Sequence, residues 1–282
     1  MRPLGRTGMR VSVLGLGTLK LGRNRGVKYP GGEGFALPTD EQATALLRAS
    51  AELGVNLIDT APAYGVSEER IGGLMAANGW FGGRARWVVC TKVGEEFDAA
   101  TGESRFDFSP AHVRTSVERS LKRLRVDALD VVLLHCGSND LWEVMGSGAL
   151  DVLRDLKRRG LVRAIGASTK SVDAGLLAVR ESGGGCDVVM VAYGPADQRQ
   201  GMVVDAAYLR GVGVIVKKGL ASGHVQGLMA KMPVEIKSTT EDPVEAAMRF
   251  ALGRAGVSSL VVGTASVAHL RANVAAAGRI SG

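Results

Sequence analysis

The stretch VVLLHCG, residues 131–137, holds four apolar residues in a row, followed by a histidine, a cysteine and a glycine. A strand with one face in water alternates apolar and polar residues, whereas a strand buried on both faces is apolar throughout. The stretch VVMVAY, residues 188–193, has the same character. Both stretches therefore predict strands of a parallel sheet whose two faces are covered, and the first of them ends in a polar side chain.

Similar runs alternate with amphipathic segments along the whole chain. The predicted strands are Val13–Thr18, Asn56–Thr60, Trp87–Val93, Leu129–His135, Arg163–Ser168, Val188–Tyr193, Gly213–Lys217 and Ser259–Thr264. The predicted helices begin at Thr39 or Asp40, at Ser67 and at Ser109, followed by Ala149–Arg159, Val172–Glu181, Met202–Arg210, Pro243–Arg254 and Val267–Ala277. Eight strand–helix repeats predict a (β/α)8 TIM barrel of the α/β class, with one domain over residues 1–282. Turn residues between two short extended pieces predict an N-terminal β-hairpin in residues 1–12.

Three predicted connections are too long for tight turns, namely residues 19–38, 136–148 and 219–242. Each of them follows a strand, so all three belong to the C-terminal face of the barrel, where the active sites of this fold are built. Loops of this length in a compact domain are usually functional or mobile. We therefore expect 136–148 and 219–242 to be active-site loops.

The composition narrows the class of protein. The 282 residues carry a formal net charge of +7, and residues 1–32 hold seven Lys or Arg and no acidic residue. This surplus fits either an anionic ligand or a solubilising surface; nucleic-acid binding is not expected, because aromatic residues do not interleave with the basic ones. No run of 18 apolar residues, no signal peptide and no paired cysteine spacing is present, so we expect a cytoplasmic protein with reduced thiols and no membrane contact.

Common ligand motifs are absent from the sequence. GLGTLK, residues 15–20, has a lysine where a dinucleotide fingerprint needs its third glycine, and no acidic residue follows at the required distance. The chain has neither a P-loop nor a Gly-x-Ser-x-Gly elbow. The four histidines show no metal-ligand spacing, so we predict no metal site.

Polar residues at the ends of three consecutive strands form one candidate constellation. Asp59 ends the second predicted strand, Tyr64 lies in the loop after it, Lys92 is near the end of the third, and His135 ends the fourth. A nearby ammonium lowers the pKa of a phenol, and a carboxylate keeps a buried ammonium charged. Asp59, Lys92 and Tyr64 thus make a consistent general acid, and the histidine can donate a hydrogen bond to a carbonyl. Taken singly, each residue also has a structural explanation, such as a helix cap or a packing tyrosine.

The chain resembles the aldo-keto reductases over nearly its whole length. The resemblance is carried by GLGT (15–18), NLIDTAPAYGVSEERIGGLM (56–75), CTKVG (90–94), LDVVLLH (129–135), LVRAIGAS (161–168), GVGVIVKKGLASG (211–223) and VVGTASVAHLRANVAAA (261–277). It implies a (β/α)8 barrel with NADP(H) across its C-terminal mouth and reduction of aldehydes or ketones. It further implies that Tyr64 is the catalytic acid, that Asp59 and Lys92 are its partners, and that His135 orients the substrate.

The resemblance also implies a set of cofactor-binding residues. They are Thr18, Asp59, Ser168, Thr169, Met190, Lys217, Lys218, Leu220, Gly263, Thr264, His269 and Asn273. Several depart from the family pattern: Thr169 replaces an Asn, Met190 a Gln, Lys217 an aromatic residue, and His269 an Arg. Gly263, Thr264 and Ala265 replace a basic stretch that commonly grips the 2′-phosphate. Arg or Lys holds such a phosphate best, so NAD(H) stays open beside NADP(H) unless Lys217, Lys218 or basic residues of 19–38 compensate.

Three hypotheses about function follow. The leading one is an NADP(H)-dependent carbonyl reductase that acts on a small carbonyl compound as a monomer or weak oligomer. Because Gly282 follows soon after the last helix, loops 136–148 and 219–242 are expected to wall a wide site. The second is a nicotinamide-binding sensor or regulatory subunit with vestigial catalysis. The third is a Schiff-base aldolase using Lys92, although a lysine paired with Asp59 is a poor nucleophile.

Overall fold

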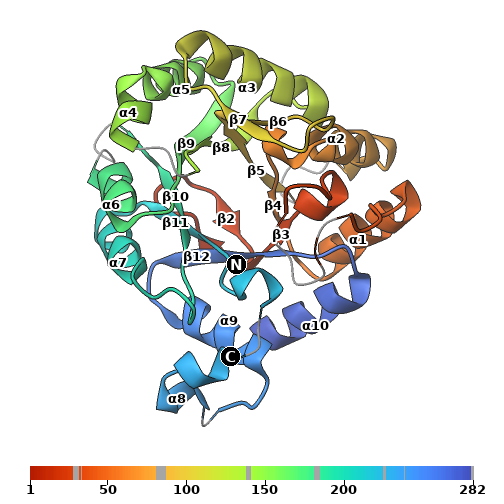
Figure 1. Ribbon diagram of the computed structural model, residues 1–282, viewed down its shortest axis with the longest axis vertical. Helices are drawn as coiled ribbons and strands as arrows, with labels where there is room; N and C mark the ends of the chain where they lie inside the picture. The colour runs from red at the N-terminus through yellow and green to blue at the C-terminus, as the bar shows by residue number, and fades with distance from the viewer. Residues whose placement is uncertain are drawn as a thin grey trace.

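The computed structural model describes residues 1–27, 32, 34–80, 87–137, 141–180, 185–224, 227–237 and 239–280. Eight strands close a barrel in the order β10-β11-β12-β3-β4-β5-β8-β9, and every neighbouring pair is parallel. These strands are β3 Leu14–Gly17, β4 Leu57–Asp59, β5 Val88–Val93, β8 Leu129–His135, β9 Val162–Ser168, β10 Val188–Ala192, β11 Gly213–Lys217 and β12 Val257–Gly263. The predicted TIM barrel and its strands are confirmed (Figure 1).

Figure 1 shows helices arranged around the barrel. In the described part of the chain, eight helices alternate with the barrel strands. They are α1 Asp40–Glu52, α2 Ser67–Ala77, α3 Pro110–Leu124, α5 Ala149–Arg158, α6 Val172–Arg180, α7 Gly201–Arg210, α9 Pro243–Gly253 and α10 Val267–Gly278. Their ends follow the predicted signals: the Thr39 side chain caps α1 through a reciprocal bond with Gln42, and Ser109 caps α3 ahead of Pro110.

Ser67 begins α2 as predicted, but its hydroxyl does not cap that helix. Val66 holds the capping position, and Ser67 Oγ donates instead to the carbonyl of Thr18 at 3.1 Å. Ser67 Oγ also lies 2.9 Å from Thr18 Oγ1, which donates to the carbonyl of Asp59 at 2.9 Å. The buried serine therefore joins α2 to the ends of β3 and β4, where the first candidate carboxylate lies.

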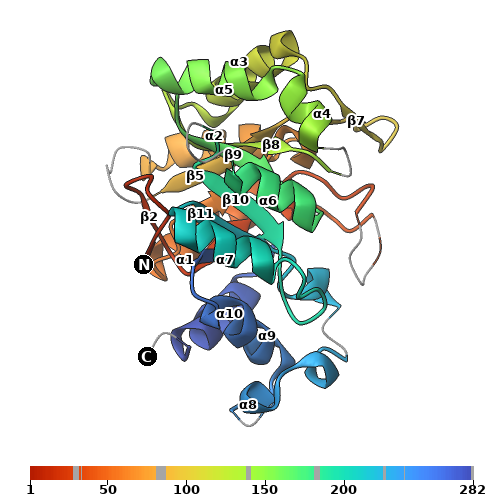
Figure 2. The same ribbon diagram turned by 90° about the vertical axis from the view of Figure 1, so that its left-hand side faces the viewer.

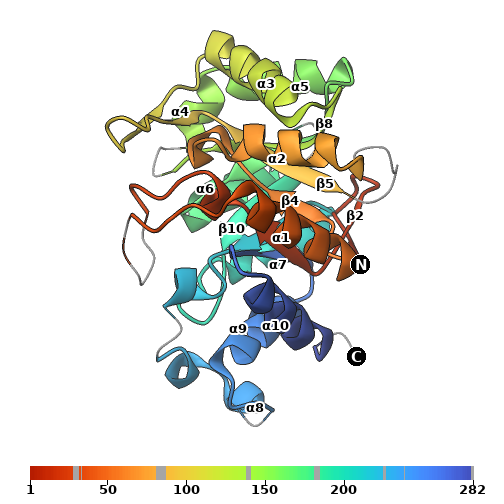
Figure 3. The ribbon, with the colours of Figure 1, turned by 90° about the vertical axis from the view of Figure 1, so that its right-hand side faces the viewer.

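The predicted N-terminal hairpin is present as β1 Arg2–Pro3 and β2 Arg10–Val11, paired antiparallel. Leu4, Met9 and Val11 are buried in one apolar cluster with barrel residues such as Leu57 and Ile215. Figures 2 and 3 place β2 at one end of the barrel and the long connections at the other. The hairpin therefore closes the N-terminal end of the barrel with apolar side chains.

The connections at the opposite end contain structure that the sequence analysis did not predict. A hairpin of β6 Glu95–Phe97 and β7 Ser104–Phe106 follows β5 directly. Within the described parts of the long loops, 136–148 includes helix α4 Leu141–Gly146, and 219–242 includes η5 Ala221–Gly223, η6 Met229–Lys231 and α8 Val234–Lys237. Parts of the loops 19–38, 136–148 and 219–242 lie outside the described residues. These additions cover the end of the barrel that carries the polar strand ends.

Candidate active site

Asp59 and Lys92 form a buried ion pair between neighbouring strands. Lys92 Nζ lies 2.6 Å from Asp59 Oδ1 and donates a second bond to the carbonyl of Thr60 at 2.8 Å. The lysine is 1% exposed and the aspartate 4%. Burial by itself would lower the pKa of Lys92, but Asp59, assisted by Tyr64 and Cys90, outweighs it, and the pKa lies above its ordinary value. The lysine is therefore held as an ammonium inside the barrel mouth.

Tyr64 reaches the same pair from the short helix η2 Pro62–Tyr64, which follows β4. Its hydroxyl lies 3.3 Å from Asp59 Oδ2 and 3.3 Å from Lys92 Nζ. The turn that follows depends on Gly65, whose φ is 63° and whose added Cβ would lie 2.2 Å from the carbonyl oxygen of Gly22. The three groups that the sequence predicted as one unit thus lie within hydrogen-bond distance of one another.

His135 completes the predicted group from the end of β8. Its ring packs edge-on against Tyr64, with ring centroids 6.4 Å apart. Its Nδ1 lies 2.9 Å from Oε2 of Glu95 in β6, although without the geometry of a linear hydrogen bond. Glu95 was not foreseen as a site residue. Nothing in the sequence signals this contact, because it depends on how the β6–β7 hairpin folds back over the mouth.

We expect the Glu95 carboxylate to favour a proton on Nδ1 of a neutral His135 ring, because Oε2 lies 2.9 Å from that nitrogen. Burial would raise the pKa of Glu95, but the bond and charge of His135, with Ser104 and Arg23, lower it to about 2. Burial, together with the charges of Lys92 and Lys217, lowers the pKa of His135 against the opposing effect of Glu95. A neutral ring then keeps its proton on Nδ1, facing the carboxylate. Its Nε2 carries a proton only when the ring becomes charged.

Ser168 and Lys217 are joined at the ends of β9 and β11. Lys217 Nζ donates to Ser168 Oγ at 2.7 Å, and Ser168 is fully buried. Burial, followed by the charges of Lys92 and Lys218, lowers the pKa of Lys217 to about 7. The family resemblance implied cofactor binding for both residues, but the hydrogen bond between them was not predicted.

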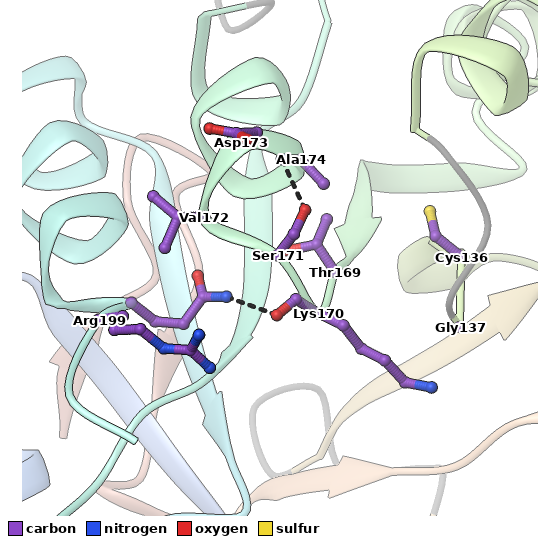
Figure 4. Close-up of a pocket in the computed structure, with 10 residues that line it drawn as sticks. Cys136, Gly137, Thr169, Lys170, Ser171, Val172, Asp173, Ala174 and Arg199 are labelled. Carbon is purple, nitrogen blue, oxygen red and sulfur yellow. Dashed lines mark hydrogen bonds between the residues drawn. The ribbon is translucent and has the colours of Figure 1, made fainter.

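A cavity of about 510 Å³ opens beside these residues, between the ends of β8 and β9 and the start of α6 (Figure 4). Thr169 and Gln200 line it, and both are 1% exposed or less. Thr169 Oγ1 and Gln200 Oε1 are buried and have no hydrogen-bond partner in the described part of the chain. The Gln200 side-chain amide nitrogen donates to the carbonyl of Lys170 at 2.8 Å, so among the described residues only its oxygen is left without a partner.

The two unpartnered atoms, Thr169 Oγ1 and Gln200 Oε1, can be compared with the hydrogen-bonding groups of a nicotinamide carboxamide. A carboxamide offers both donors and an acceptor, so it can satisfy a hydroxyl such as Thr169 and an amide oxygen such as that of Gln200. Met190, by contrast, is 1% exposed, has no hydrogen-bonding N or O in its side chain, and packs in the barrel interior. Gln200 was missed by the sequence analysis, which considered only the strand position of Met190.

The remaining predicted cofactor residues lie at the end of β12 and along α10. Thr264 Oγ1 accepts from the amide of Ser266 at 3.0 Å, and Ser266 Oγ accepts from the amide of His269 at 3.3 Å. A second cavity, of about 350 Å³, lies between α1 and the start of α10 and is lined by Ala36, Pro38, Gln42, Ala45, Ala265 and Val267. Among the described residues, the side chains that line this cavity are uncharged.

The backbone after β11 is unusual. Lys218, Ala221 and Ser222 have φ of 58°, 47° and 57°, and they are three of the four non-glycine residues with positive φ in the described ranges. Such conformations cluster at functional sites because the surrounding structure must hold them. Lys218 is exposed and Leu220 packs partly buried against the core. This segment therefore lies beside Lys217 as a constrained rim of the mouth.

The described residues contain neither a metal-binding cluster nor a helix that could span a membrane. No group of three or more His, Cys, Asp or Glu side chains is placed to hold a metal ion. Among the helices in these ranges, none combines the length and apolar character that a membrane crossing requires.

Comparison with known proteins identifies the family. The profile of the Aldo/keto reductase family matches residues 13–279. L-galactose dehydrogenase of Arabidopsis thaliana is 31% identical over 299 residues, covering 98% of this chain and 87% of that protein. The NADH-specific methylglyoxal reductase of Escherichia coli is 31% identical over 208 residues, covering 70% and 59%. A solved aldo-keto reductase from Pseudomonas aeruginosa superposes with a TM-score of 0.82 at 44% identity, covering 100% of this chain and 95% of that one. The chain belongs to the aldo-keto reductase family of oxidoreductases.

Proposed function

We propose that the protein reduces aldehydes or ketones to alcohols, with NADP(H) as cofactor and NAD(H) as the alternative, and that Tyr64 supplies the proton. The observation that carries the proposal is the unit of Asp59, Lys92 and Tyr64, with contacts of 2.6 Å and 3.3 Å. We further propose that it acts as one domain in the cytoplasm on a small carbonyl compound, as a monomer or weak oligomer. No role for nucleic acid is included.

The proposed chemistry divides between the cofactor and the chain. The bound nicotinamide would supply the hydride, a transfer that no side chain can perform. Tyr64 donates a proton to the carbonyl oxygen as negative charge develops there, and Lys92 stabilises the phenolate that remains. Asp59 keeps Lys92 charged through its 2.6 Å contact, and microscopic reversibility gives the same residues the opposite roles in alcohol oxidation.

His135 adds orientation to this scheme. Once its ring is protonated, Nε2 can donate to the carbonyl oxygen while Nδ1 stays against Glu95. The second proton raises the positive potential at the point where the oxygen gains charge. The reduction is therefore expected to quicken as the pH falls through the lowered pKa of His135.

Thr169 and Gln200 are the residues we expect to hold the nicotinamide carboxamide, because Thr169 Oγ1 and Gln200 Oε1 are buried without a hydrogen-bond partner in the described ranges. Ser168 can take part only if it shares its hydroxyl with Lys217. We expect the rest of the cofactor to be held by residues at the ends of β3, β11 and β12 and along α10. They are Thr18, the rim from Lys218 to Leu220, Gly263, Thr264, His269 and Asn273.

A regulatory or sensor role is the second candidate. It is favoured by the uncharged lining of the cavity near α10 and by the occupied hydroxyl of Ser168. A protein of that kind would bind a nicotinamide nucleotide without sustained turnover.

Side-by-side titrations with NADPH and NADH, monitored by tryptophan fluorescence, test both the reductase and the sensor proposal. We expect saturable binding of at least one reduced cofactor and multiple turnovers on 4-nitrobenzaldehyde. Binding without turnover on any simple aldehyde would favour the sensor, and failure to bind either nucleotide would refute both.

A further inference from the structure

Two lysines lie at the mouth of the barrel, and in the described part of the chain Lys217 lacks the carboxylate partner that Lys92 has. Lys217 Nζ has the hydroxyl of Ser168 at 2.7 Å, and in the described part of the chain no carboxylate lies within 4.0 Å of it. Lys92, four strands away in the sequence order, has Asp59 at 2.6 Å. Lys217 is partly buried, and a neutral hydroxyl does not compensate a partly desolvated positive charge as a carboxylate does.

The charges that face Lys217 favour its neutral form. Lys92 of β5 and Lys218 of the following rim are both cationic and repel an ammonium. Asp59 lies beyond ion-pair distance and is already bound to Lys92. His135 at the end of β8 and Cys136, the residue after it, also interact with this amine. Burial raises the thiol pKa of Cys136 to about 12, so the thiol is neutral at pH 7, and burial lowers the pKa of His135.

We propose that Lys217 is a second reactive site of the barrel, at which small unhindered aldehydes form a reversible imine. A lysine that is desolvated beside another cation is the usual setting for an amine nucleophile in an enzyme. When a neutral amine at Lys217 donates an N–H to Ser168 Oγ, it keeps its lone pair. The pKa of about 7 agrees with this reading.

The reaction balances without a further reagent. The nitrogen lone pair forms the C–N bond, one amine proton moves to the carbonyl oxygen, and a carbinolamine results. Loss of water then removes that oxygen with the second amine proton and leaves a C=N bond. No oxidant or reductant is consumed, and addition of water reverses the sequence.

This assignment moves the Schiff-base hypothesis from Lys92 to Lys217. Lys92 is held as an ammonium by Asp59, so its lone pair is not available. An imine at Lys217 would also draw the aldehyde away from Tyr64. High concentrations of aldehyde are therefore expected to slow any reductase activity by a covalent and reversible route.

Reductive trapping tests the inference directly. The purified protein is incubated at pH 7.5 with limiting glycolaldehyde and cyanoborohydride, and tryptic peptides are quantified by mass spectrometry. A trapped imine adds the mass of the aldehyde less one oxygen atom. Because ordinary lysines have a pKa of about 10.4 and are almost wholly protonated here, we expect Lys217 to be labelled at least about tenfold faster than exposed lysines.

Variants and pH make the outcome decisive. Lys217→Arg keeps a cation but cannot form an imine, and Lys122→Arg, on the exposed face of α3, is the matched control. Labelling should lose its fast phase in the first variant and keep it in the second, with circular dichroism confirming the fold of both. The fast phase should rise between pH 6 and 8 and should persist in Tyr64→Phe, whatever the reductase assay shows. Labelling of Lys217 at the rate of surface lysines, or preferential labelling of Lys92, would overturn the proposal.

Discussion

The two ends of the barrel are built from different kinds of side chain. At the N-terminal end, Leu4 and Val11 of the hairpin are fully buried against apolar strand residues. At the C-terminal end, Asp59 and Lys92 are also buried but charged, and their charges compensate each other across a 2.6 Å contact. Apolar burial adds stability without a partner of defined chemistry, whereas a buried charge needs its partner. Changes at the first end should therefore affect folding, and changes at the second should affect chemistry.

Tyr64→Phe should separate chemistry from stability most completely. The substitution removes only the hydroxyl that lies 3.3 Å from both Asp59 and Lys92, so we expect kcat for aldehyde reduction to fall by about 10²- to 10⁴-fold with cofactor affinity nearly unchanged. Steady-state kinetics and a fluorescence titration measure the two quantities. Tyr208→Phe, at a 60% exposed position on α7, is the control. Full reductase activity in the Tyr64 variant would show that another group is the acid.

Asp59→Asn should lower both the free energy of unfolding and kcat. It leaves Lys92 buried without its counter-charge, which is expected to lower the free energy of unfolding by about 3–5 kcal/mol or to neutralise the lysine. In either case the support for the Tyr64 phenolate is lost and kcat falls. Urea unfolding and kinetics of Asp59→Asn and of the exposed control Asp127→Asn provide the measurement. Unchanged stability and unchanged kcat together would contradict the pairing argument.

Leu4→Ala should lower the stability of the protein and leave its catalytic efficiency unchanged. Leu4 is fully buried, and it lies so close to β11 that a Cβ added to Gly213 would be 2.8 Å from its Cδ1. The cavity left behind is expected to cost about 2–5 kcal/mol of unfolding free energy, while kcat/KM of the folded protein stays the same. Leu209→Ala, at a 79% exposed position, should change neither quantity. A loss of kcat/KM in the Leu4 variant at temperatures where it remains folded would break the separation of the two ends.

Glu95→Gln should give the smallest effect, a change in pH dependence. In the wild type, Nε2 of His135 gains a proton only below the lowered pKa of the ring, so kcat/KM for reduction should rise toward acid pH. A glutamine can donate to Nδ1 and let the neutral ring carry its proton on Nε2, which should flatten the profile between pH 5 and 7.5. Glu103→Gln, in the exposed turn of the same hairpin, is the control. Identical profiles for Glu95→Gln and the wild type would remove Glu95 from the mechanism.

Much of this contrast could be predicted from the sequence. Runs such as VVLL predicted strands covered on both faces, and the strand order then placed Asp59, Lys92 and His135 at one end. The contacts of Glu95 and Gln200 could not be predicted in this way. Both residues lie in connections, where the path of the chain depends on tertiary packing and not on a period in the sequence. The bond between Lys217 and Ser168 was missed for another reason, since each residue already had a role implied by resemblance.

The contacts of Arg2 have a consequence for how the chain folds. Its guanidinium donates to the carbonyls of Leu252 and Val257, at 2.9 and 2.8 Å, which lie 250 and 255 residues further along the chain. β3 likewise pairs with β12, the last strand of the barrel. Arg2 therefore obtains these native partners only after the chain has been synthesised as far as Val257. Contacts of such long sequence separation slow folding. The apolar side chains of the hairpin therefore stay exposed to solvent, or shielded from it, until β12 closes the barrel.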